Sequence, residues 1–431
     1  MLILKKLISL SLFIAAINLA SVTAQDPEPY YFKPYKQLPA TPVKNQQQTG
    51  TCWAFSAVSF LESEVERING FQVNLSEMFV VRNIYHQKCE NFVRRQGTAQ
   101  FGEGGLAHDA INAVRQYGVM PEDIYPGRKE PTRQLNHSAL EKKLKDMCAE
   151  YADLGKKGTL PADWLTKIDA ALDEEFGVVP RKFSVEGKPF TAGVYRDYLG
   201  INPDNYVTIT SFTHHPFYQP FILEVPDNFS NGQMLNLPLD EMMRSLNYSV
   251  QQGYSVEWDA DVSNDGFSAK YALALVPDKN WADKNEAQRT STFKYLEPQK
   301  KITQEYRQDQ FDRQITMDDH LMHITGIETE TSTTGIYYTV KNSWGEIADL
   351  KGYLRVSEAY MRLNTISFMV NKNALPIDIA QRFGLAPGEA TIPETPKAKS
   401  KTQTMEAAPN SSVKLRKMAP AAKKASPAED H

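Results

Sequence analysis

Cysteine is scarce in this 431-residue chain, and apolar runs of membrane-spanning length are missing from nearly all of it. With only three cysteines, an odd number, the chain has no dense disulfide framework, and at least one thiol has no partner within the chain. After the first 24 residues, no segment approaches the length of a transmembrane helix. These absences exclude a small disulfide-stapled scaffold and a multispanning membrane protein.

Strong net charge and internal repeats are also absent. Forty-eight Lys and Arg residues oppose 52 Asp and Glu residues, giving a formal net charge of -4. Composition therefore gives no reason to expect nucleic-acid binding. What is present, 41% hydrophobic and 23% charged residues, is typical of a globular protein with one large or two to three modest domains.

The two ends of the chain differ in composition from the middle. Lys5 and Lys6 precede a short apolar run, and small residues up to Ala24 offer a cleavage site. Residues 1–24 are therefore predicted to be a signal peptide, with export to the periplasm or the exterior after cleavage near Ala24. The run is too short to favour a transmembrane anchor. Residues 389–431, rich in Lys, Ala and Pro, are predicted to be a disordered basic tail.

Residues 46–68, QQQTGTCWAFSAVSFLESEVERI, are the most informative stretch. Apolar residues recur every three or four positions from Ala54 to Ile68, which predicts a helix that ends at Asn69-Gly70. Cys52 then lies in the first turn, where unpaired amides and the helix dipole favour a thiolate. The alternative is a buried structural thiol. If Cys52 is a free nucleophile, Cys89 and Cys148 could form a disulfide, but their spacing leaves this open.

Two segments far downstream could supply the base and the orienting group that a nucleophilic thiol needs. His320, in MDDHLMHITGIE, begins a strand-like run, and strand alternation turns His323 to the opposite face. Asn342, in KNSWG, follows another strand. A metal cluster of the two histidines with the preceding aspartates is a weaker alternative, because ligands on opposite strand faces fit poorly. We expect neither a metal nor another cofactor.

These three segments resemble those of papain-superfamily cysteine peptidases, which carry Q-x5-C-W-[AS]-F, a D/T-H-A segment and K-N-S-W-G. The resemblance implies that Cys52 is the nucleophile, His320 the base and Asn342 the orienting group of a thiolate–imidazolium pair. Gln46, six residues before the cysteine, would hold the oxyanion.

The same resemblance implies three residues that border the substrate. Gly104-Gly105 would let the peptide backbone approach closely, since a side chain there would obstruct it. Trp344 would complete the site by shielding the bond between His320 and Asn342 from water.

Further segments, such as GVMP at 118–121 and LPLD at 237–240, resemble the bleomycin hydrolase and aminopeptidase C group. The likeness covers most of residues 40–376 and implies an aminopeptidase-like enzyme that forms a thioester acyl-enzyme. In that group the chain's own C-terminus lies in the cleft and restricts cleavage to the amino end. This chain continues past Pro376, so endopeptidase or aminopeptidase action, side-chain specificity and oligomeric state stay open.

The order of elements favours an α+β fold, because a helical first half precedes a β-rich second half. The resemblance implies a papain-like two-lobed peptidase domain over residues 25–388, with large insertions. Its helical lobe would span about 44–200, with an insertion at 127–180. Its β-rich lobe would span about 201–376, with a cleft between the lobes.

Two other functions remain open at this point. One is a catalytically silent peptide-binding or scaffold protein of the cell envelope. The other is an acyl-transfer enzyme with a transglutaminase-like fold, but such enzymes prefer Asp as the orienting group, so Asn342 favours the peptidase. The expected partners are peptide or protein substrates, with no nucleic acid and no stable membrane insertion, and a homo-oligomer is not excluded.

Overall fold

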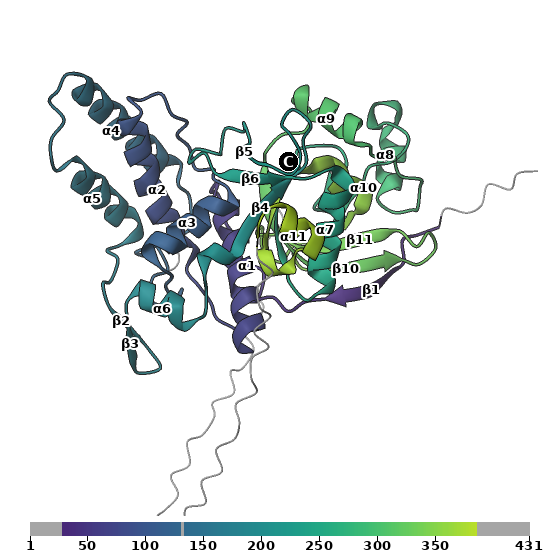
Figure 1. Ribbon diagram of the computed structural model, residues 1–431, viewed down its shortest axis with the longest axis horizontal. Coiled ribbons are helices and arrows are strands. Elements are labelled where there is room, and N and C mark those ends of the chain that lie inside the picture. Colours follow the sequence, from purple (N-terminus) through teal and green to yellow (C-terminus); the bar gives the residue numbers. More distant parts are fainter. Residues whose placement is uncertain (1–27, 131–132, 386–431) are drawn as a thin grey trace, which may run out of the picture. The chain divides into compact units, whose positions relative to one another are not determined.

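The computed structural model describes residues 28–130 and 133–385 (Figure 1). The predicted signal peptide, its cleavage site and the predicted basic tail lie outside these residues. None of the helices in the described part of the chain is both long and apolar enough to cross a bilayer.

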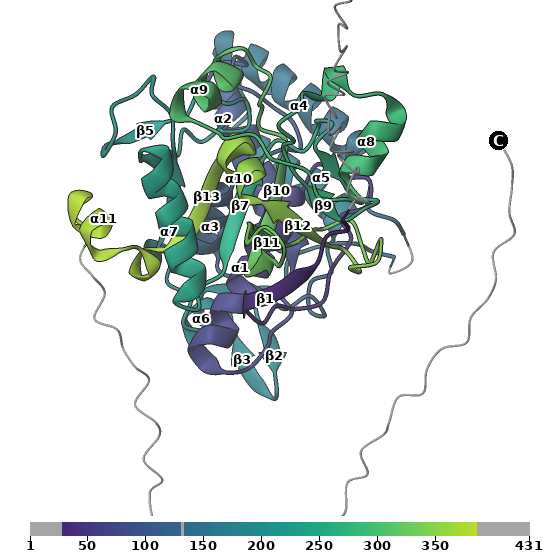
Figure 2. The same cartoon turned by 90° about the vertical axis from the view of Figure 1, so that its right-hand side faces the viewer.

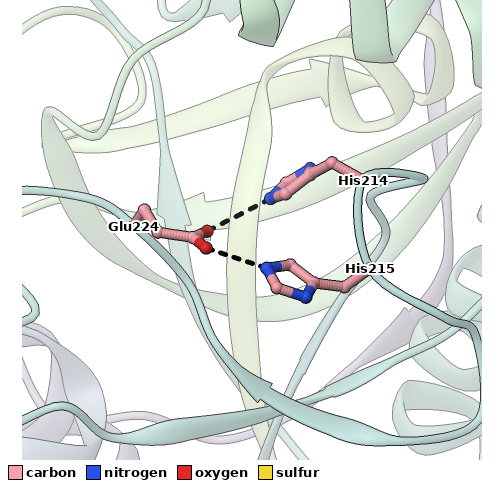
Figure 3. Close-up of side chains that lie close together, drawn as sticks. All are labelled: His214, His215 and Glu224. Atoms are coloured by element: carbon pink, nitrogen blue, oxygen red, sulfur yellow. Dashed lines mark hydrogen bonds and ion pairs between the residues drawn. The ribbon is translucent and has the colours of Figure 1, made fainter.

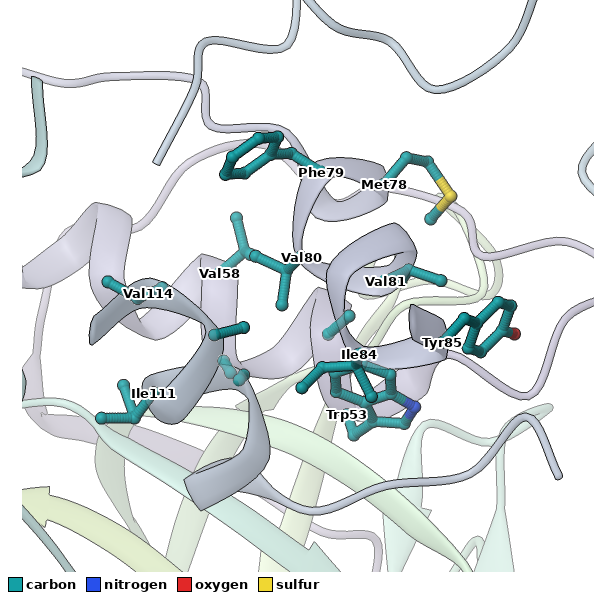
Figure 4. Close-up of a cluster of buried hydrophobic side chains, with 14 of the residues drawn as sticks. Trp53, Val58, Met78, Phe79, Val80, Val81, Ile84, Tyr85, Ile111 and Val114 are labelled. Carbon is teal, nitrogen blue, oxygen red and sulfur yellow. The ribbon is translucent and has the colours of Figure 1, made fainter. Parts of the chain in front are cut away.

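The first half of the described chain is mostly helical. Its helices are α1 (Cys52–Asn69), α2 (Glu77–Arg94), α3 (Ala107–Tyr117), α4 (Ser138–Lys156), α5 (Trp164–Phe176) and α6 (Ala192–Tyr198). A short hairpin of β2 (Phe183–Val185) and β3 (Lys188–Phe190) precedes α6. Apolar side chains from α1, α2 and α3 interlock in one buried core (Figure 4). Helices α4 and α5, from the predicted insertion, pack against α2 and extend this core.

The second half and one strand from the start of the described chain form a single sheet, which has eleven strands among the described residues. Its order is β5-β6-β4-β13-β7-β10-β11-β12-β9-β8, and β1 also pairs with β10 (Figure 2). The strands are β1 (Phe32–Gln37), β4 (Tyr206–Thr210), β5 (Pro220–Ile222), β6 (Gln233–Asn236), β7 (Val256–Ala260), β8 (Phe267–Ser268), β9 (Leu273–Ala274), β10 (His320–Glu330), β11 (Ile336–Lys341), β12 (Tyr353–Ser357) and β13 (Thr365–Asn371).

Shorter helices surround this sheet and enclose a second hydrophobic core. Helix α7 (Leu239–Gln251) packs on β7 and β10. The others are α8 (Glu286–Thr292), α9 (Gln304–Asp312), α10 (Glu358–Asn364), α11 (Ile377–Arg382) and the 3-10 helices η1 (Pro203–Asn205), η2 (Trp281–Asp283) and η3 (Lys372–Ala374). A helical half followed by a β-rich half confirms the predicted α+β class.

Local sequence signals account for several helix ends. Gly70 adopts the left-handed conformation that ends α1, with φ 75°, and the Ser76 side chain accepts from the Phe79 amide at the start of α2. The pattern Ser138-x-x-Glu141 is typical of a capping box, but no capping box forms there. Ser138 is already the first helical residue of α4, and His137 stands at the cap without a side-chain bond.

The sequence leaves open whether Cys89 and Cys148 form a disulfide, and in the structure both are free thiols. Cys89 on α2 and Cys148 on α4 are both buried, and their side chains share a hydrogen bond. They therefore contribute to packing between α2 and α4 as small apolar groups, not as a covalent link.

A seam of buried polar groups fixes α1 against β10. The Ser56 hydroxyl, one turn after Cys52, lies 2.6 Å from the Met322 carbonyl oxygen and 3.1 Å from Glu257 Oε1. Burial raises the pKa of Glu257 to about 8. The carboxyl group is therefore mostly protonated at neutral pH and can donate to Ser56, while Ser56 donates to Met322.

Replacing Ser56 with alanine should loosen this seam. The change leaves the buried Met322 carbonyl and Glu257 carboxyl without their partner, so we expect the free energy of unfolding to fall by about 1–3 kcal/mol. Urea denaturation followed by circular dichroism measures this. Ser184→Ala, on the exposed face of β2, should change stability by less than about 0.5 kcal/mol. Equal effects of the two substitutions would contradict the assigned role of Ser56.

Candidate active site

Cys52 lies at the N-terminal end of α1, where that helix meets β10. Its side chain is buried, with 8% exposed, and the backbone amides of Trp53 and Leu321 hydrogen-bond to the sulfur and favour its ionised form. The Thr51 hydroxyl bonds the Thr49 hydroxyl at 2.6 Å and does not cap the helix, so the first-turn amides are not occupied by a side-chain cap. The helix position predicted for Cys52 is confirmed, and Leu321 places the sulfur next to the first residue of β10.

His320, the first residue of β10, hydrogen-bonds to Asn342, the residue that follows β11. His320 Nε2 lies 2.7 Å from Asn342 Oδ1. The Ser343 amide donates to the same Asn342 atom at 2.7 Å, which identifies that atom as the oxygen. His320 therefore carries a proton on Nε2, and its Nδ1 lone pair is available to accept one. The Trp344 ring lies against the imidazole at a centroid distance of 4.7 Å.

Gln46 ties the segment before Cys52 to the segment that contains Asn342. Its backbone amide donates to the Ser343 carbonyl at 2.8 Å, and the Ser343 hydroxyl donates to Gln46 Oε1 at 2.6 Å. Gln46 Nε2 donates to the Thr49 carbonyl at 2.7 Å. One N–H of the side-chain amide is thus used internally, and the second is available for a ligand.

The two reacting groups are close in the fold but are not bonded to each other. Among the described residues, no hydrogen bond joins the Cys52 sulfur to an imidazole. Burial, reinforced by the charges of Asp318 and Asp259, raises the pKa of Cys52 to about 12. Burial also lowers the pKa of His320, although the bond to Asn342 and the charge of Asp319 oppose this. Both shifts favour the neutral thiol and imidazole, not the ion pair that the sequence resemblance implies.

The predicted glycine pair borders Trp53 and a loop from the β-rich half. A Cβ on Gly105 would lie 3.1–3.4 Å from the Trp53 indole, whose Nε1 donates to the Glu103 carbonyl at 3.0 Å. A Cβ on Gly104 would occupy the space of the Asp227 carboxylate. A side chain at Gly104 would therefore displace the Asp227 carboxylate, and one at Gly105 would crowd the Trp53 indole.

His323 does not share the site of His320. Its Nδ1 lies 2.9 Å from the Ser59 hydroxyl, and its ring meets Phe60 edge-on at 6.2 Å. The two histidines have separate partners, so this segment does not bring them together as metal ligands. His323 instead belongs to the seam between α1 and β10.

A second pair of histidines converges on a carboxylate (Figure 3). His214 and His215 lie 3.2 and 2.8 Å from the two oxygens of Glu224. Gln308 Oε1 accepts from the Thr213 amide at 2.6 Å, so its Nε2 must donate to His214 Nδ1 at 3.0 Å. His214 then carries its proton on Nε2, which faces Glu224. In this tautomer the nitrogen has no lone pair for a metal, so the hydrogen bonds alone account for the cluster.

Sequence reasoning misses four carboxylates around the site, two of which, Asp318 and Asp259, act by their charge on the sulfur. Asp318 and Asp319 are visible next to His320, but the sequence suggests only a metal role for them. Asp259 on β7 and Asp227 after β5 give no local signal, because only strand pairing and a long loop bring them close.

Three comparisons place the chain among known proteins. The sequence model of the Peptidase C1-like family matches residues 92–395, which include His320 and Asn342 and begin after Cys52. Aminopeptidase C of Lactobacillus delbrueckii subsp. lactis is 23% identical over 382 residues, covering 79% of this chain and 82% of that protein. Bleomycin hydrolase of Homo sapiens is 22% identical over 388 residues, covering 78% and 82%.

The fold is also found among solved structures. The crystal structure of PepW from Lactobacillus rhamnosis HN001 has a TM-score of 0.65 at 19% identity, and the match covers 82% of this chain and 84% of that one. The papain-like α+β architecture predicted from the sequence is thus confirmed.

The raised pKa of Cys52 predicts how its alkylation depends on pH. Only the thiolate reacts, and below a pKa of about 12 its fraction rises about tenfold per pH unit. The rate at which iodoacetamide modifies Cys52 should therefore be low at neutral pH and should still be rising at about pH 9. The rate for an ordinary thiol with a pKa of about 8.5 levels off there. Mass spectrometry of the peptide that contains Cys52 gives the rate, with a free-cysteine peptide as control. A rate that is constant from about pH 5 to about pH 8 would instead indicate a thiolate–imidazolium pair.

Proposed function

Because the chain belongs to the Peptidase C1-like family and is a cysteine-type peptidase of the aminopeptidase C and bleomycin hydrolase type, we propose that Cys52, His320 and Asn342 are its catalytic residues. The observation that carries this proposal is the His320–Asn342 bond at 2.7 Å, one residue from the Leu321 amide that contacts the sulfur. The contact between Cys52 and Leu321 joins residues that lie some 270 positions apart in the sequence.

In this mechanism His320 acts as a general base when substrate arrives. Its Nδ1 lone pair takes the thiol proton after the sulfur and the ring move into contact, since catalytic hydrogen bonds often tighten only in the substrate complex. The thiolate attacks the peptide carbonyl, and His320 returns the proton to the leaving amine. Water then hydrolyses the thioester with His320 again as base.

The same segments supply the groups that stabilise the developing charge. The free N–H of Gln46 Nε2 and the Cys52 amide are the proposed oxyanion donors, each contributing about 3 kcal/mol to the barrier reduction. Asn342 holds the imidazole in the required tautomer, and Trp344 shields that bond from water. Gly104 and Gly105 border the substrate backbone.

We further propose that the enzyme is exported and removes residues from the amino end of peptides. Export is supported by the basic and apolar character of residues 1–24. Amino-end action is supported by the names of the relatives, aminopeptidase C among them. The family match favours this peptidase over the scaffold and acyl-transfer alternatives.

Substitutions at the proposed triad should abolish turnover without unfolding the protein. We expect Cys52→Ala and His320→Ala each to lower kcat/KM by at least about a thousandfold, and Asn342→Ala by about tenfold to a hundredfold, since it only orients the base. Hydrolysis of a fluorogenic peptide measures this. His86→Ala, which removes a hydrogen bond to Asp169, should retain activity. Full activity of Cys52→Ala would refute the assignment of the nucleophile.

The position of cleavage tests amino-end action separately. The mature protein should cut a peptide with a free amino group and leave its N-acetylated form intact, because an exopeptidase must engage the chain end. Mass spectrometry of the products maps the cuts. Internal cuts in both forms would show an endopeptidase instead.

A further inference from the structure

The loop between β5 and β6 leaves the β-rich half of the chain and packs on the helical half. We call this loop, residues 223–232, the strap. It connects two neighbouring strands at one edge of the sheet. The buried side chains of Leu223 and Phe229 nevertheless belong to the core built mainly from α1, α2 and α3, not to the core that the sheet and α7 enclose. The strap therefore crosses from one half to the other.

The far end of the strap contacts two helices. On α2, the Lys88 ammonium lies over the Phe229 ring, 5.0 Å from its centroid. On α3, His108 Nε2 lies 3.1 Å from the Ser230 hydroxyl. A Cβ on Gly232 would overlap the His108 ring, so the absence of a side chain there lets the strap approach α3 closely. These contacts fasten the strap to the helical half at several points.

A buried asparagine fixes the shape of the strap from within. Asn228 Oδ1 accepts from the Gly232 amide at 2.7 Å. Its Nδ2 donates to the carbonyl oxygens of Leu223 and Gly232 at 3.0 and 3.1 Å. One side chain thus bonds the first and the last residue of the strap, and both donors and the acceptor of its amide are used. The strap is therefore a closed, bonded loop and not a loose connection.

The strap meets the proposed site at Gly104. A Cβ at this glycine would overlap the Asp227 carboxylate. The close approach that a missing side chain permits is therefore used here by the strap itself. Because two groups cannot share one space, a substrate backbone cannot lie on this face of Gly104 while Asp227 is in place.

The glycine segment is itself fastened to the N-terminal end of α1. The Trp53 indole donates to the Glu103 carbonyl at 3.0 Å, and the Gly50 amide donates to the Glu103 carboxylate at 2.6 Å. These two donors stand on either side of the proposed nucleophile in the sequence. Lys88 donates to the Gly104 carbonyl from the opposite side. The place where the strap covers Gly104 is thus fixed relative to the nucleophile.

The proposed mechanism decides which part of a peptide the strap faces. His320 returns its proton to the leaving amine, so the part of the peptide after the scissile bond lies on the side of His320 and Trp344. The part before that bond is held on the Cys52 sulfur as the thioester. It extends away from His320, toward the glycine segment. The strap therefore stands across the amino-terminal part of the substrate.

We propose that the strap closes the amino-side end of the substrate-binding site and limits how many residues can precede the scissile bond. The inference rests on the proposed function and supplies a structural cause for amino-end action. The exclusion is steric, because a longer peptide would have to displace Asp227 from Gly104 and break the contacts that hold the strap. This closure lies between β5 and β6, and it needs no contribution from residues near the C-terminus.

The length of the first product tests this role of the strap. A peptide of about a dozen residues with a free amino group is incubated briefly with each protein, and mass spectrometry measures the amino-terminal fragments at early times. The proteins are the native form, Asp227→Gly, Phe229→Ala and the control Asp278→Gly. Asp227→Gly clears the face of Gly104, and Phe229→Ala removes the apolar anchor of the strap. Asp278 is exposed in a bend of the β-rich half.

We expect the native protein and Asp278→Gly to release amino-terminal fragments of a single short length. In Asp227→Gly the share of longer fragments should rise by about tenfold or more, because the end of the site is then open. Phe229→Ala should shift the fragments in the same direction, and circular dichroism checks that it folds. Because Asp227 is only partly buried, its variant should fold even if Phe229→Ala does not.

Internal cuts by the native protein, or identical fragments from Asp227→Gly and Asp278→Gly, would overturn the role of the strap and leave the proposed catalytic residues intact. Absence of turnover by the native protein would count against the proposed function. In that case, calorimetric titration with the same peptide compares Cys52→Ala with the double variant Cys52→Ala/Asp227→Gly. Binding that is about tenfold tighter in the double variant supports the closed end, and equal binding refutes it.

Discussion

The polar seam between α1 and β10 is the constraint on which the proposed site depends. Apolar packing could hold a helix against a strand in several registers, but hydroxyl groups bonded to particular backbone and side-chain atoms specify one. Ser56 engages Met322, and Ser59 accepts from Lys341 at 2.8 Å while it bonds His323. This register brings the first residue of the helix to the first residue of the strand, and so brings Cys52 beside Leu321 and His320.

The same seam explains why two nearby histidines have different surroundings. His323 faces α1 and is part of the packing, with burial and the nearby Lys341 charge lowering its pKa well below the usual value. His320 lies where the strand begins and reaches Asn342 and Trp344. A polar interior of this kind is costly unless its members are bonded, and most of these are.

Features encoded locally could be predicted from the sequence. Periodicity placed the helix after Cys52, and Asn69-Gly70 marked its end. Of the three residues that short motifs singled out, the structure bonds His320 to Asn342 and places Cys52 against Leu321. The pairing of β1 with β10 could not be foreseen, because nothing in residues 32–37 specifies a strand some 290 positions away. The charge state of Cys52 could not be predicted from the sequence either. First-turn amides favour a thiolate, whereas burial and the charges of Asp318 and Asp259 favour the neutral thiol.

The raised pKa of Cys52 has a chemical consequence for an enzyme proposed to work outside the cell. Oxidants convert thiolates to sulfenic acid far more readily than they convert thiols, and further oxidation is irreversible. A sulfur that stays protonated while the site is empty resists this damage in an oxidising environment. The burial of Cys52, which disfavours its ionisation in the absence of substrate, would thus also slow the inactivation of the enzyme by oxidants.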